Sequence, residues 1–413
     1  MVWKNFKKRI VIFLAIVGPG LITAVADNDA AGVATYSVAA SLYGMASQYL
    51  VIPTTILLGI TQEIGARISI VTGKGLGSLI REKYGVKMAI GIFFLYFIVN
   101  QTVVLQDVTG LKSAIQLFGL PWQIVLISTC LLLILMVIKL NFKKLQKIFL
   151  FMILFYVSYV VSAILVNPDW KEAIQESFIL PQKVNIFDPG YWFSLIAVLG
   201  TTVTLWGQFF ISSFIVDKGL TKGDLKANKV EVYGGAFLTN FLSWMMAIAV
   251  TFTLFTNHIV VTDGYAAAKA IEPLAGSFSS LLFGIGLFAA SVLGLFIVPL
   301  ATAYVFTEMF GFERTLNVDF KTGKVFYIFF VLQIVLALII ALFPGINLFS
   351  LTLLGNYLNG AALPVIFYFV IKFSESKELM GEHVAKGFGK WFVRLALVVI
   401  VLAVSVSVLQ NFI

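Results

Sequence analysis

Apolar runs long enough to cross a lipid bilayer recur along the whole 413-residue chain, separated only by short polar segments. A helix needs about 20 predominantly apolar residues to span the hydrocarbon core. Hydrophobic residues make up 60% of the chain and charged residues 12%, a balance that is incompatible with a water-exposed surface. The sequence therefore predicts an all-α polytopic membrane protein whose main surroundings are the lipid bilayer.

Glycine, proline and basic residues divide these runs into eleven predicted spans. They cover about residues 11–38, 47–72, 88–117, 121–139, 147–166, 191–215, 230–256, 276–309, 325–343, 347–372 and 391–411. The first 26 residues also resemble a secretory signal peptide. Gly18-Pro19-Gly20 would break its apolar core, so we expect an uncleaved first span.

The net charge of +9 comes from basic residues grouped at the ends of the spans. If the N-terminus is cytoplasmic, most lysines and arginines fall on the inner side, whereas the outer loop at 167–190 is acidic. The positive-inside rule then predicts an inner (cell) membrane protein with a cytoplasmic N-terminus and an external C-terminus. The charge reflects topology, and we expect no nucleic-acid partner; the oligomeric state stays open.

Polar residues interrupt two of the spans, at residues 26–32 and at residues 200–208. The two breaks are five spans apart, which is the pattern of an inverted-repeat transporter with its site at mid-membrane. The repeats would cover about residues 11–166 and 191–372, followed by an extra helix at about 391–411. Unwound backbone in a bilayer exposes carbonyl groups that need a partner, and a cation can supply one.

Asp27 and Asp29 are ionisable groups inside the first span, and such groups by default mark a pathway or a site. Asp29 is the predicted metal ligand, with an N-cap of the second half-helix as the alternative. Asp27 and Asn28 either line the route or cap a half-helix. The sequence contains no Walker-type loop, HExxH pair or G-x-S-x-G elbow. We expect neither an enzyme nor a cofactor, and secondary rather than ATP-driven transport.

Several short motifs follow one another through the first ten spans. They are Gly18-Pro19-Gly20, Asp29 followed by Val33-Ala34-Thr35, Gln62 with Ala66-Arg67 and Thr72-Gly73-Lys74, Gln106-Asp107-Val108, and Leu363-Pro364. Together they resemble the Nramp family of divalent-metal transporters. The resemblance implies a LeuT-type fold with five-plus-five repeats and import of manganese or iron with protons. It also implies that Asn356 stands at the family's glutamine in span 10, and Asp107 at its acidic position in span 3.

The breaks depart from the family pattern at the ligand positions. Asp29 is kept, but Gly32 stands where the family has asparagine. Thr201, Thr204 and Trp206 stand where it has alanine, methionine and histidine. In these changes the chain is similar to the Nramp-related magnesium transporters, a bacterial branch of the family.

The ligand types support the same interpretation. A thioether favours soft transition metals, whereas carboxylate, hydroxyl and carbonyl oxygens suit magnesium, calcium or manganese. Magnesium keeps several waters and is usually held by one or two carboxylates, and Gly32 is expected to leave room for a partly hydrated ion. We therefore predict transport of Mg²⁺, and also Mn²⁺. The predicted metal-binding residues are Asp29, Thr201, Thr204, Gly32, Asn356 and Asn28.

Proton coupling is not expected, because Trp206 replaces the family's histidine and no histidine lies in a span. Asp107 remains a candidate proton carrier, in the outer vestibule or in a proton route. Gln62 and Gln208 line the pathway or only join helices, and Asp27 and Trp206 complete the pathway candidates. The alternatives are a proton-coupled Mn²⁺/Fe²⁺ importer and a LeuT-type amino-acid transporter, although Asp29 would repel a substrate carboxylate.

Overall fold

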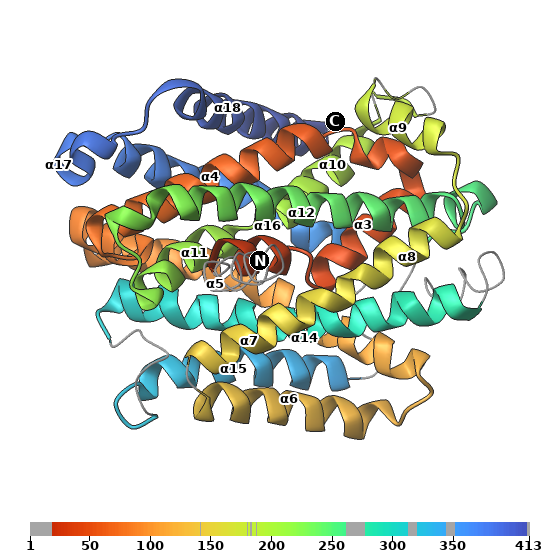
Figure 1. Ribbon diagram of the computed structural model, residues 1–413, viewed down its shortest axis with the longest axis horizontal. Helices are drawn as coiled ribbons and strands as arrows, with labels where there is room; N and C mark the ends of the chain where they lie inside the picture. Colours follow the sequence, from red (N-terminus) through yellow and green to blue (C-terminus); the bar gives the residue numbers. More distant parts are fainter. Residues whose placement is uncertain are drawn as a thin grey trace, which may run out of the picture.

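The chain is described by a computed structural model over residues 19–140, 142–179, 181, 184–186, 188–261, 277–312, 320–343 and 352–410. All regular secondary structure in these ranges is helical. The prediction of an all-α membrane protein is therefore confirmed. The long helices lie side by side, with their ends at the left and right of Figure 1.

Nine helical segments of the described residues are long and apolar enough to cross a membrane, and they correspond to the last nine predicted spans. Two of these segments consist of two helices each, α7 with α8 and α10 with α11. The helices are α5 (Leu76–Leu117), α6 (Trp122–Lys139), α7 (Phe142–Ile153), α8 (Val157–Leu165), α10 (Pro189–Thr202), α11 (Leu205–Lys218), α12 (Leu225–Thr251), α14 (Ser277–Phe310), α15 (Lys324–Leu342), α16 (Thr352–Ser374) and α18 (Gly387–Gln410).

The first two predicted spans correspond to α2 (Pro19–Ala26) with α3 (Ala30–Tyr43), and to α4 (Val51–Thr72). The segments Ala30–Gln48 and Val51–Thr72 meet the same criterion only together, as a pair bent by 91°. The sequence predicts eleven spans. In the described part of the chain nine helical segments meet the length and hydropathy criterion, or up to ten if this bent pair is counted. The polar side chains of α4 explain the difference, and residues 11–18 of the first predicted span lie outside the described ranges.

The buried centre of the bundle is formed by the interrupted helices. The most apolar stretch of α10–α11 is 100% buried, whereas the same measure is 22% in α6 and 17% in α18. Figure 1 places α6 and α18 at opposite edges of the bundle. The polar breaks therefore lie at the centre, whereas α6 and α18 have the exposed positions at the edges that a bilayer would cover.

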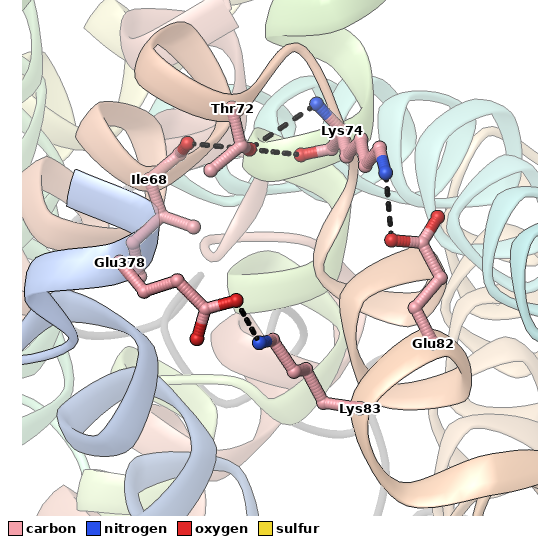
Figure 2. A network of polar contacts seen from close by, with 6 residues as sticks. All are labelled: Ile68, Thr72, Lys74, Glu82, Lys83 and Glu378. Atoms are coloured by element: carbon pink, nitrogen blue, oxygen red, sulfur yellow. Dashed lines mark hydrogen bonds and ion pairs between the residues drawn. The ribbon is translucent and has the colours of Figure 1, made fainter.

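The connections that carry basic residues lie at one end of the bundle. Figure 1 shows the α4–α5, α11–α12 and α16–α17 connections at the left, where α17 is Lys377–Met380, and α9 (Trp170–Phe178) at the right. Figure 2 shows two ion pairs at this end, Lys74 Nζ with Glu82 Oε2 at 2.6 Å and Lys83 Nζ with Glu378 Oε1 at 2.8 Å. The first pair joins the α4–α5 connection to α5, and the second joins α5 to α17. Exposed pairs contribute about 0–1 kcal/mol each, so neither dominates stability.

Candidate metal site

Both predicted interruptions are present as breaks in the helical hydrogen bonding. The first is the segment Asp27–Asp29 between α2 and α3, and the second is Val203 with Thr204 between α10 and α11. The second break is shorter than the predicted interval, because α10 continues through Thr202. Thr201 therefore belongs to the last turn of α10.

The residues of both breaks are closed off from solvent. Asp27, Asn28 and Asp29 are each 1% exposed, and Thr204 is 3% exposed. Ionised carboxylates at this depth are costly unless a specific partner neutralises them. The structure thus describes an occluded arrangement around the first break.

Asp29 caps α3 with one carboxylate oxygen, and the other accepts no hydrogen bond from the described residues. Its Oδ1 accepts a hydrogen bond from the backbone N–H of Gly32 at 2.9 Å. Its Oδ2 is buried and has no hydrogen-bond partner within the described residues. The capping role and a ligand role therefore do not compete, because each uses a different oxygen.

Asp27 uses both of its carboxylate oxygens within the protein. Oδ1 accepts from Thr204 Oγ1 at 2.7 Å, and Oδ2 accepts from Gln62 Nε2 at 3.2 Å. Thr204 Oγ1 also accepts from Gly207 N at 3.0 Å and so caps α11. Asp27 thus joins the first break to the second break and to α4, a role that the sequence alone did not distinguish from lining the route.

Asn28 is held by α12 and by the α7–α8 junction. Its Nδ2 donates to Thr239 O at 2.7 Å, and its Oδ1 accepts from Ser243 Oγ at 2.6 Å. Tyr156 OH donates to the backbone oxygen of Asn28 at 2.8 Å. The side chain therefore fixes the first break against span 7. Sequence reasoning missed these three partners, since nothing in the local sequence around them differs from other polar residues in spans.

Asn356 on α16 lies against the first turns of α3. Its Nδ2 donates to Thr35 Oγ1 at 2.6 Å and to Gln106 Oε1 at 3.1 Å, and lies 3.4 Å from Ala31 O. Its Oδ1 is buried without a hydrogen-bond partner in the described part of the chain. One amide oxygen from span 10 is therefore available close to Asp29.

Gly32 and Thr201 bring the two breaks into contact. A Cβ atom at Gly32 would lie 2.8 Å from Asp27 O and 3.5 Å from Thr201 Oγ1. In this occluded arrangement the backbone of the first break lies where a side chain at position 32 would begin, so the expectation that Gly32 leaves room for a hydrated ion stays a prediction for an open state. Thr202 Oγ1 donates to Val198 O at 2.7 Å and is also hydrogen-bonded to Tyr36 OH of α3 at 2.6 Å, so Thr202 adds a second link between the two interrupted spans.

Two pathway candidates on α11 are buried, and their side chains form no hydrogen bond with the described residues. Neither Nε2 nor Oε1 of Gln208 has a partner among the described residues, and the same holds for the indole Nε1 of Trp206. Trp206 packs edge-on against Phe210, with ring centroids 6.3 Å apart. An indole N–H only donates and has no basic nitrogen, so Trp206 cannot take up a proton as a histidine would.

Asp107 on α5 is placed at the first break rather than at the edge of the bundle. Its Oδ1 accepts from the backbone N–H of Ala30 at 3.0 Å, and its Oδ2 is buried without a described partner. None of the ion pairs recorded for the described residues includes Asp27, Asp29 or Asp107. Three carboxylates therefore surround the break, and no basic side chain in the described part of the chain forms an ion pair with them.

The donor set consists of oxygen atoms. The described residues contain no group of three His, Cys, Asp or Glu side chains arranged to hold a metal. Carboxylate, hydroxyl, amide and carbonyl oxygens are the groups that line the breaks, and such donors suit hard divalent cations with water in the remaining positions.

Comparison with known proteins agrees with this architecture. Residues 20–410 match the family described as "Natural resistance-associated macrophage protein-like". The "Divalent metal cation transporter MntH" of Listeria welshimeri is 26% identical over 407 residues, which cover 92% of this chain and 85% of that protein. A crystal structure of the Eremococcus coleocola manganese transporter aligns with a TM-score of 0.73 at 16% identity, covering 95% of this chain and 85% of that one.

The fold extends beyond metal transporters. The structure of MhsT in complex with L-phenylalanine aligns with a TM-score of 0.54 at 16% identity, covering 94% of this chain and 97% of that one. These likenesses show a shared LeuT-type fold, as predicted. A shared fold does not decide the substrate, which depends on the groups at the site.

Proposed function

Because this chain belongs to the Nramp family of membrane transporters, and is therefore no enzyme, we propose that it imports divalent metal cations by alternating access, preferring Mg²⁺ and also accepting Mn²⁺. The observation that carries the proposal is Asp29, a buried carboxylate at a helix break with one oxygen left unpartnered by the described residues. The relative from Listeria welshimeri, named a divalent metal cation transporter, supports the substrate class.

The preference for magnesium rests on the chemistry of the donors. Thr204 and Thr201 contribute hydroxyl groups at the second break, where a thioether would favour softer metals. Mg²⁺ dehydrates reluctantly and usually keeps several waters. Opening of the occluded site during the transport cycle would have to supply the space for those waters.

An amino-acid substrate fits the site poorly. In LeuT-type transporters a half-helix N-terminus receives the substrate carboxylate. Here the N–H groups of Ala30 and Gly32 at the start of α3 already donate to Asp107 and Asp29. A substrate carboxylate would find those donors occupied by two groups of its own charge.

In the proposed orientation the protein lies in the inner (cell) membrane with its N-terminus in the cytoplasm. The basic connections at the left end of Figure 1, with Lys74, Lys222 and Lys377, would then face inward. The acidic side chains near α9 at the other end would face outward, as the positive-inside rule favours.

Transport is expected to proceed without proton coupling, because Trp206 offers no basic nitrogen in span 6. The membrane potential alone contributes about 4.6 kcal/mol per 100 mV for a divalent ion. In liposomes containing only this protein, Mg²⁺ entry should rise with an imposed potassium-diffusion potential, while an internal pH dye should report no acidification.

Protein-free liposomes under the same potential provide the baseline for this assay. Acidification in proportion to Mg²⁺ or Mn²⁺ uptake, lost in Asp107→Asn at metal concentrations where that variant still takes up the ion, would show that a carboxylate carries protons without the histidine. That result would favour the alternative of a proton-coupled Mn²⁺ importer of the ordinary family type.

A soft ligand at the second break is expected to change the ion ranking. Thr204→Met together with Thr201→Ala should weaken the binding of Mg²⁺ relative to that of Mn²⁺ or Cd²⁺ by about 1–3 kcal/mol, the scale of one ligand contact to a charge. Competition binding to the purified protein would measure the shift. Gly32→Asn is unsuitable for this test, because a Cβ at position 32 would lie 2.8 Å from the backbone oxygen of Asp27 and would disturb the first break.

Thr204→Ser is the matched control, since serine can still cap α11 and donate to Asp27. We expect the control to keep the parental ranking. An unchanged ranking in the methionine variant would show that donor hardness at position 204 does not set selectivity.

A further inference from the structure

Two carboxylates from different helices bind the first turn of the same half-helix. Ala30 N donates to Asp107 Oδ1 of α5, and Gly32 N donates to Asp29 Oδ1 of the first break. The two donors are only two residues apart at the N-terminus of α3, where backbone N–H groups and the helix dipole favour negative charge. Asp29 and Asp107 are therefore neighbours, although they are far apart in the sequence.

In the described ranges, the second oxygen of each of these carboxylates accepts no hydrogen bond. Asp29 Oδ2 and Asp107 Oδ2 are both buried and lack partners within the described residues, and so does Asn356 Oδ1. Asn356 belongs to the same place, because its Nδ2 lies 3.4 Å from Ala31 O. A buried acceptor without a donor is destabilising, and more so when it is charged. Three such oxygens around one helix turn point to a ligand that accepts electron pairs.

The fold fixes the position of Asp107. A Cβ atom at Gly294 of α14 would overlap both carboxylate oxygens of Asp107 and lie 2.5 Å from its Cγ. A Cβ at Gly110 would overlap Ala30 Cβ and lie 2.9 Å from Ser291 Oγ. Glycine at these two positions lets α5 approach α3 and α14 closely enough for the carboxylate to reach the break.

Asp27 differs from these two carboxylates. Both of its oxygens already accept hydrogen bonds, from Thr204 and from Gln62. Asp27 therefore holds the two breaks together, whereas the carboxylate oxygens that lack a partner among the described residues belong to Asp29 and Asp107. Two carboxylates together neutralise one divalent cation, and Mg²⁺ sites commonly use one or two carboxylates plus water.

We infer that Asp107 is a second carboxylate ligand of the transported ion, which would bind between Asp29 Oδ2 and Asp107 Oδ2 with Asn356 Oδ1 as a third protein oxygen. This inference rests on the proposed function and extends it to a residue outside the two broken helices. The ligand class is a hard divalent cation that retains water at its other positions.

The test is calorimetric binding of Mg²⁺ and Mn²⁺ to the purified full chain and its variants. Asp107→Asn keeps an oxygen to accept from Ala30 N but removes the charge. Removing a group that only orients a ligand already costs about 10–100-fold in affinity. We therefore expect Asp107→Asn to lower the affinity by more than that, as Asp29→Asn is expected to do. Asp27→Asn removes the same charge, but both oxygens of Asp27 already accept hydrogen bonds. We therefore expect Asp27→Asn to lower the metal affinity clearly less than Asp107→Asn does.

Gly294→Ala gives an independent measurement, because it changes no ligand and only displaces the Asp107 carboxylate. We expect it to lower the affinity as well. If Asp107→Asn does not fold, two other measurements test whether Asp107 binds the ion: the affinity of Gly294→Ala, and anomalous scattering from Mn²⁺ in crystals of the parent protein. The anomalous peak should lie between the two Oδ2 atoms, and a peak away from Asp107 would overturn the inference.

The outcomes separate this inference from the proposed function. Parental Mg²⁺ affinity in Asp107→Asn, with loss in Asp29→Asn, would remove Asp107 from the ligands and leave the transporter proposal intact. Equal losses of metal affinity in Asp107→Asn and Asp27→Asn would show an effect of charge alone and would also overturn the inference on Asp107. A parent protein that neither binds nor transports Mg²⁺ or Mn²⁺ would overturn both.

Discussion

Asp29→Asn is expected to abolish uptake of Mg²⁺ into liposomes and to remove high-affinity binding in calorimetry. Asparagine caps a helix about as well as aspartate, so the hydrogen bond from Gly32 N can persist and α3 should form. The lost group is the buried Oδ2 with its charge, to which the ion would bind directly. The loss should exceed the roughly 10–100-fold effect of groups that act only through another ligand.

Asp169→Asn is the matched control for this variant. Asp169 also caps a helix, accepting from Lys171 N and Glu172 N at the start of α9, but it lies outside the spans. We expect the control to fold and transport like the parent. Parental transport by Asp29→Asn, in contrast, would eliminate the site proposed at the first break.

Gly200→Ala is expected to destabilise the protein by roughly 3 kcal/mol or more, at the upper end of the cost of overpacking. A Cβ at this position of α10 would overlap the backbone oxygen of Asn356 and lie 2.5 Å from Gly360 N. Both are backbone atoms of α16, so no side-chain rotation can relieve the clash and the two helices must separate. Small residues at such crossings are what let membrane helices pack closely.

The thermal unfolding midpoint of the purified protein measures this effect. Gly234→Ala is the matched control, because this glycine lies within α12 and its Cβ would meet nothing within 4 Å. Alanine is the better helix former, so the control should be neutral or slightly more stable. If both variants unfold at the parental temperature, the close contact of α10 with α16 does not limit stability.

The sequence alone determined the fold class and the location of both breaks. Apolar length, basic flanks and polar interruptions are local properties, and membrane insertion responds to them directly. The motif around Asp29 and the departures at Thr204 and Trp206 were sufficient to indicate a metal transporter with altered ligands. The prediction of the first two spans was weaker, because α2 is short and α4 carries several polar side chains.

Only the tertiary structure decided which polar oxygens already have partners and which do not. Asp27 meets Thr204 across 177 positions of sequence, Asn28 meets Thr239 across 211, and Ala30 meets Asp107 across 77. No local pattern encodes such pairings, because they depend on how closely helices distant in sequence approach one another. The packing assigns Asp27 and Asn28 to internal hydrogen bonds, and it brings Asp107, expected in a vestibule or proton route, beside Asp29 with one oxygen unpartnered by the described residues.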